Sequence, residues 1–76
     1  MNILKEIADS YTYNGSVSLM ALEDDIETIE NQIESDNIAL REVRLRNMND
    51  VPLVARIREN KIRLSLLKAF LSLSFL

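Results

Sequence analysis

Residues 62–76, with the sequence IRLSLLKAFLSLSFL, decide how this chain can fold. Ten of these fifteen residues are apolar, and at helical spacing they form two stripes. The first stripe runs through Leu64, Leu67 and Leu71. The second runs through Ile62, Leu66, Ala69, Leu73 and Leu76, with Phe70 between the two. A helix that is apolar over most of its circumference must be buried on more than one side. We therefore expect that one helical partner from the same chain cannot cover it, and that this end lies inside an oligomer or larger assembly.

The length and composition of the chain point to association and away from catalysis. At 76 residues it forms one domain, and a monomer of that size is marginally stable because it buries only about 60% of its unfolded surface. The chain has no cysteine and no histidine, which removes disulfides, thiolate metal sites and serine–histidine or cysteine–histidine catalysis. We expect no enzyme activity, no cofactor and no small-molecule substrate. Oligomerisation is the remaining way to stabilise so small a domain.

The N-terminus lacks the basic and then apolar pattern of a secretory signal, and no stretch reaches the roughly 18 apolar residues that span a bilayer. These features predict a soluble cytoplasmic protein and count against membrane contact, with a membrane-active peptide that inserts residues 62–76 into lipid as a less favoured alternative. With one glycine and one proline in the whole chain, we expect long helices joined by few turns.

The order of the chain predicts an all-α fold. Residues 1–15 read as a short amphipathic helix and arm that end in an Asn14-Gly15 turn, and residues 16–76 read as an antiparallel helical hairpin. Its first helix, about 17–48, is expected to begin at Ser16 or Ser18, and Ser18 is a candidate N-cap. The turn covers about 47–51, and the second helix covers about 52–75 with Pro52 in its first turn. The first helix carries apolar residues at alternating gaps of three and four, the spacing of a helix-packing seam: Leu19, Leu22, Ile26, Ile29, Ile33, Leu40 and Val43.

Asp36 occupies a seam position, so the first helix either runs on or breaks near residue 36. We favour one continuous helix because the seam resumes in register at Leu40. Asp36, Asn47 and Asn60 either fix the register of the helices or lie where solvent reaches the seam. Ile38 and Leu45 form a second apolar stripe away from the seam.

Charge is divided along the chain. Residues 1–36 carry a net charge of −8, and residues 37–76 carry +5. In a hairpin folded about Asn49, the arginines near the turn lie beside one another, and the acids at the start of the long helix meet no base. A second hairpin laid antiparallel to the first resolves both mismatches, so a four-helix dimer is the favoured prediction. A ring or a filament satisfies the same complementarity.

Two sets of residues are candidate sites. The expected oligomer interface is apolar and comprises Leu19, Leu22, Ile26, Ile29, Ile33, Leu40, Val43, Leu53, Ile57, Ile62, Leu64, Leu66, Leu67, Phe70, Leu71, Leu73 and Leu76. The second set is a possible contact for anions or an acidic partner, and comprises Arg41, Arg44, Arg46, Arg56 and Arg58. The acidic group Glu23, Asp24, Asp25 and Glu27 lacks the ligand spacing of a calcium or di-metal site, so it reads as a solvated helix face and no metal is expected.

These features predict a non-catalytic protein–protein interaction module: a small assembly, adaptor or chaperone-like subunit that binds itself and another protein. In size and hairpin form the chain resembles small subunits and chaperones of bacterial secretion needles and small phage proteins, although no motif supports that likeness. The alternative is a small nucleic-acid-binding or regulatory bundle that uses the arginines near the turn. The acidic net charge and the lack of aromatic residues among those arginines count against nucleic acid.

Overall fold

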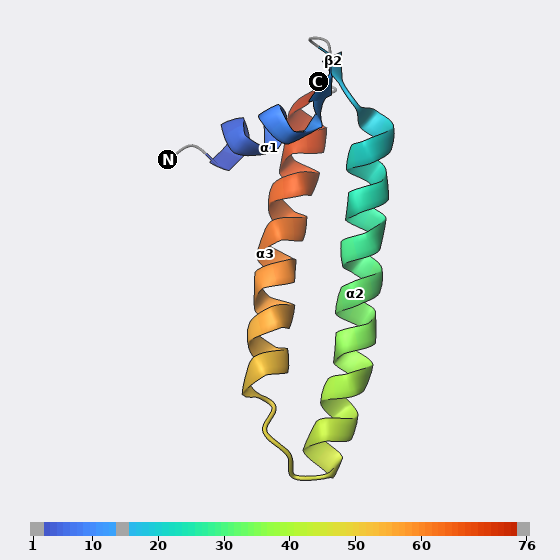
Figure 1. The fold of residues 1–76 in the computed structure, drawn as a ribbon, viewed down its shortest axis with the longest axis vertical. Coiled ribbons are helices and arrows are strands. Elements are labelled where there is room, and N and C mark those ends of the chain that lie inside the picture. The colour runs from blue at the N-terminus through green and yellow to red at the C-terminus, as the bar shows by residue number, and fades with distance from the viewer. Residues whose placement is uncertain (1–2, 14–15, 75–76) are drawn as a thin grey trace.

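The computed structural model describes residues 3–13 and 16–74, and within them the predicted all-helical class is confirmed. Helix α1 covers Ile3–Tyr11, α2 covers Leu19–Leu45 and α3 covers Val51–Ser74. Helices α2 and α3 lie side by side and are joined at one end of the molecule, and α1 lies against α3 at the opposite end (Figure 1). The predicted Asn14-Gly15 turn falls outside the described residues.

A short segment ties α1 to the start of α2. Strands β1, Thr12–Tyr13, and β2, Ser16–Val17, pair in antiparallel fashion, two residues each. The Ser18 amide also donates a hydrogen bond to the Tyr11 carbonyl oxygen at 2.6 Å. Ser18 is the N-cap of α2, as predicted, because its Oγ accepts a hydrogen bond from the Ala21 amide at 3.3 Å. The end of α1 and the start of α2 are therefore held together.

Helix α2 runs without a break through Asp36 to Leu45, so the expected continuity near residue 36 is confirmed. Its end comes before the expected residue 48, because Asn47 has a φ of 53°. The Met48 amide donates to the Val43 carbonyl oxygen at 3.0 Å, and the Asn47 amide donates to that of Arg44 at 3.2 Å. This pair of bonds is the Schellman pattern of a helix end with a left-handed residue.

Helix α3 starts after a short loop. The Asn49 Oδ1 atom accepts a hydrogen bond from the Val51 amide at 3.1 Å, and the Asp50 carbonyl oxygen accepts one from the Val54 amide at 3.0 Å. Pro52 lies in the first turn of the helix, where no intrahelical bond needs its missing amide hydrogen. None of the described helices is long and apolar enough to span a bilayer.

The main core lies at the end of the hairpin where α1 docks. Its buried residues are Ile7 and Tyr11 of α1, Leu22 and Ile26 of α2, and Leu67 and Phe70 of α3. Leu66, on the second stripe of α3, packs against this cluster and is half-buried. The sequence led us to expect that the chain itself leaves the apolar surface of α3 largely uncovered, and the structure corrects this expectation in part. Helix α1 provides a second partner, which covers Phe70 and part of the second stripe.

Candidate functional site

The structure divides the predicted interface residues into three groups. Leu22, Ile26, Ile57, Leu67 and Phe70 are buried within the chain, so they have little surface left to offer a partner. Ile29, Ile33, Leu40, Val43, Leu53, Leu64, Leu66 and Leu71 are half-buried. Leu19, Ile62 and Leu73 are exposed. Leu76 lies outside the described residues.

Ile62 and Leu73 belong to one exposed strip on the outer side of α3. Their side chains are 56% and 60% exposed. Ala69 lies between them at helical spacing and is exposed as well. We call Ile62, Leu66, Ala69 and Leu73 the α3 strip. It contains the described members of the second predicted stripe, of which Leu66 is half-buried.

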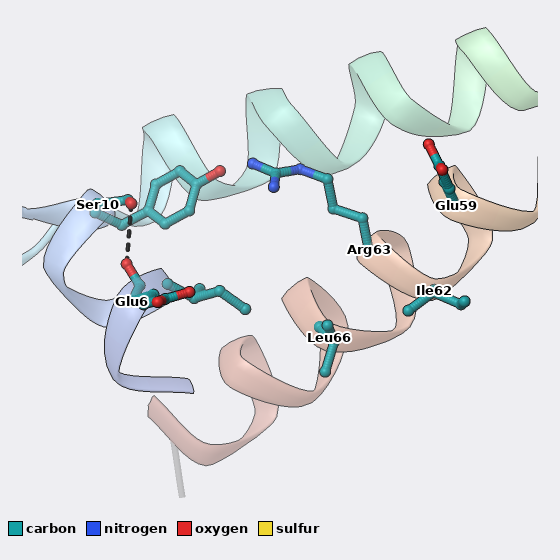
Figure 2. Close-up of a pocket in the computed structure, with 8 residues that line it drawn as sticks. Glu6, Ser10, Glu59, Ile62, Arg63 and Leu66 are labelled. Carbon is teal, nitrogen blue, oxygen red and sulfur yellow. Dashed lines mark hydrogen bonds between the residues drawn. The ribbon is translucent and has the colours of Figure 1, made fainter. Parts of the chain in front are cut away.

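A groove runs between α1 and α3 beside the α3 strip and has a volume of about 360 Å³. Figure 2 shows Ile62 and Leu66 on α3, with Glu59 and Arg63 on the same helix and Glu6 and Ser10 on α1. Ile7 and Tyr11 complete the lining. The sequence did not reveal this groove, because spacing within α1 does not show which helix α1 will contact.

Tyr11 links this groove to α2. Its phenol donates a hydrogen bond to the Asp25 carboxylate. Burial, the hydrogen bond to Asp25 and the negative charge of Asp25 raise the pKa of Tyr11 above its ordinary value of 10.0, whereas Arg63 acts in the opposite direction. Tyr11 therefore stays protonated at neutral pH and joins α1 to α2 through a neutral hydroxyl group.

A second groove, of about 590 Å³, lies between α2 and α3. Its lining contains Ile33 and Ile38 of α2, Leu64 of α3, and the polar residues Glu30, Glu34, Asn37 and Arg41. At its edge Lys68 Nζ lies 3.5 Å from Glu30 Oε2. Lys61, Leu64 and Lys68 are spaced three and four apart, so Lys61 shares this side of α3. We call the groove with Lys61 and Lys68 the α2–α3 face.

Three of the five arginines of the predicted site, Arg44, Arg46 and Arg56, pair with acids of the same chain, and Arg41 and Arg58 are exposed. Arg44 Nε lies 3.1 Å from Asp50 Oδ2, and Arg46 Nη2 lies 3.7 Å from Glu42 Oε2. For Arg44 and Arg46, these pairs correct the expectation that the charges near the turn are badly matched within one hairpin. They also leave fewer free cations for phosphate groups.

The third pair is between Arg56 and Asp36, and it was missed from the sequence. Asp36 is 2% exposed, and its carboxylate accepts hydrogen bonds from both Arg56 and Gln32. The hydrogen bond from Arg56 is the main reason that the pKa of Asp36 lies below its ordinary value. The Gln32 bond and the Arg56 charge add to that effect, and burial opposes it. From the sequence, Asp36 either fixes the register of the helices or lies where solvent reaches the seam. Its burial and its pairing with Arg56 favour the first explanation.

Within residues 3–13 and 16–74, no three carboxylates gather in a way that could hold a metal ion. In comparisons with known proteins, the chain matches no protein family, no curated protein and no solved structure.

Proposed function

We propose that this chain is a non-catalytic protein–protein interaction module that contributes its exposed apolar helix surfaces to a helical bundle with other chains. One observation carries the proposal. Among the described side chains, nine large apolar residues are exposed, nine are half-buried and seven are buried. A folded domain normally buries most of its large apolar side chains, so this balance favours further association.

The exposed apolar residues lie outside the packed core. Ile38 is 56% exposed on α2, Ile62 and Leu73 are exposed on α3, and Leu45 at the end of α2 is 83% exposed. Helices α1 and α2 already pack against α3, so in our proposal a second chain provides the additional cover. Burying such side chains contributes about 25 cal/mol per Å² of apolar surface.

A dimer of hairpins is the simplest closed form of this assembly. It brings four long helices together and doubles the core of a chain that is marginal alone. The grooves beside α3 leave room for a different protein as well. We propose adaptor or chaperone-like activity on this basis, since an amphipathic helix fits such a groove.

The test is to measure association and folding together. Sedimentation velocity and native mass spectrometry over a wide concentration range should detect a dimer or larger species. Urea unfolding should shift to higher urea as the protein concentration rises, because association stabilises only the folded state.

Variants identify the surface. Replacing Ile38 with glutamate should weaken self-association and leave helix content unchanged, because this side chain lies outside the core. Asn31→Glu and Ser72→Glu are matched controls at exposed polar positions. A chain that remains a stable monomer at all concentrations would overturn the proposal.

A further inference from the structure

We infer that the α2–α3 face receives a second copy of this chain, with α2 of each copy lying over α3 of the other. The two hairpins then point in the same direction, in place of the antiparallel placement predicted from the sequence. The inference rests on the proposed self-association and adds the surface and the orientation.

The acids on this face lie on α2, and α3 contributes only bases. The groove contains Glu30, Glu34 and the base Arg41 on α2, whereas α3 contributes Lys61 and Lys68. Lys68 pairs with Glu30 of the same chain, and both side chains remain about half exposed, at 55% and 50%. In the part of the chain that the structure describes, neither Glu34 nor Lys61 lies in an ion pair. The face therefore presents an unpaired acid on one helix and an unpaired base on the other.

Two closed arrangements can place this face against itself. A two-fold axis parallel to the helices lays α2 over the partner's α3 and keeps each residue at the same height along the molecule. The ion pair between Glu30 and Lys68 within one chain shows which residues of α2 and α3 lie at the same height. Glu34 of one copy then lies near Lys61 of the partner subunit, and the same pairing occurs a second time by symmetry.

The other arrangement, with the two-fold axis across the helices, stacks α2 on α2 and α3 on α3. It places α3, whose charged side chains on this face are lysines, against itself. The one acid in α3, Glu59, lines the groove with α1 instead. On α2, Arg41 can offset the repulsion between acids, but α3 offers no acid that offsets its lysines. Like charges in contact oppose association and unlike charges orient it, so the parallel two-fold axis is favoured.

The face also has apolar residues. Ile38, Ile33 and Leu64 line the groove, and each is contributed twice in a dimer. A standard interface buries about 800 Å² per partner, so the contact has to extend along much of the 50 Å length of the molecule.

Charge reversal tests the inference on the full-length chain. Glu34→Lys or Lys61→Glu alone should raise the dimer Kd about tenfold, because each places like charges together twice. The double variant, Glu34→Lys with Lys61→Glu, should restore the dimer. Asp24→Lys is the matched control, since it makes the same charge change at an exposed position on another side of α2.

The two arrangements predict opposite signs. With the axis across the helices, Glu34→Lys and Lys61→Glu each relieve repulsion and should tighten the dimer. Tighter association by these variants, or Kd values equal to that of the control, would overturn the inference.

A distance measurement gives an independent readout. The chain has no cysteine, so a nitroxide attached to Met48→Cys reports only the turn end, where Met48 is 61% exposed. Two hairpins that point the same way should give a short distance between labels. A distance near the 50 Å length of the molecule would overturn the inference. A monomeric wild-type chain, by contrast, would overturn the proposed function itself.

Discussion

Arg56 joins α3 to α2 through a two-point ion pair with the buried carboxylate of Asp36. Arg56 Nε donates to Asp36 Oδ2 at 2.8 Å, and Arg56 Nη2 donates to Asp36 Oδ1 at 2.6 Å. Gln32 Nε2 donates to Oδ1 at 2.9 Å. The pair spans the middle of the hairpin, where a shift of the helices along each other would break it.

Removing Arg56 alone should destabilise the fold more than removing both charges. Arg56→Met keeps the length of the side chain but leaves the Asp36 carboxylate buried without a cation, which is a costly arrangement. In Asp36→Leu with Arg56→Met, no charge remains to desolvate. Urea unfolding should therefore give a higher free energy of unfolding for the double variant than for Arg56→Met alone. The opposite ranking would show that the pair itself supplies stability.

The lowered pKa of Asp36 predicts how stability changes with pH. Its folded pKa lies below the ordinary value of 3.8, so its contribution is fully present above that pH and is lost as the pH falls through the folded pKa. The stability difference between the wild type and Asp36→Asn should therefore shrink as the pH falls from neutral into the acid range. Urea midpoints in a series of buffers measure it. A difference that does not change with pH would contradict the depressed pKa.

Leu67 belongs to the core of a single chain, and its side chain is fully buried. Leu67→Ala should lower the free energy of unfolding by about 2–5 kcal/mol. Leu67→Asp should prevent folding, so its loss of association would be secondary. Leu73→Ala, on the same helix but at an exposed position, should change stability by less than about 0.5 kcal/mol. Equal effects of the two alanine variants in urea unfolding would show that Leu67 is not packed as described.

Tyr11→Phe should reduce the free energy of unfolding by about 1 kcal/mol, because it removes the hydrogen bond to Asp25 and keeps the ring.

The raised pKa of Tyr11 also predicts how stability changes with pH. Its contribution to stability is present below pH 10.0, the ordinary value, and is lost as the pH rises through the higher folded pKa. In a Tyr13→Phe background Tyr11 is the one remaining tyrosine, so its phenolate absorbance should rise with a midpoint above pH 10.0. Ionisation below it would contradict the assignment.

Asn47 has a positive φ of 53°, a region that glycine enters without steric cost. Asn47→Gly should preserve or raise stability, whereas Asn47→Ala should lower it by about 1 kcal/mol. Asn31→Gly is a control with the opposite sign. Asn31 lies inside α2, where glycine disfavours the helix. Thermal unfolding of the three variants measures these effects, and a stabilising Asn47→Ala would contradict the left-handed conformation.

The sequence by itself determined the local features of this protein. Spacings of three and four with few helix breakers indicated helices throughout, and Ser18 was identified as a cap because a cap acts on amides within one turn. The seam that resumes at Leu40 indicated that α2 continues past Asp36. Each of these features depends on neighbours a few residues away, so spacing is sufficient to predict it.

Tertiary structure alone decided which surfaces meet. The docking of α1 on α3, which buries Phe70, and the reach of Arg56 to Asp36 join residues far apart in sequence. Such contacts depend on the angle between helices, the exact end of α2 at Asn47 and the length of each side chain. Sequence spacing carries none of this information, and for that reason the ion pair between Asp36 and Arg56 became visible only in the folded chain.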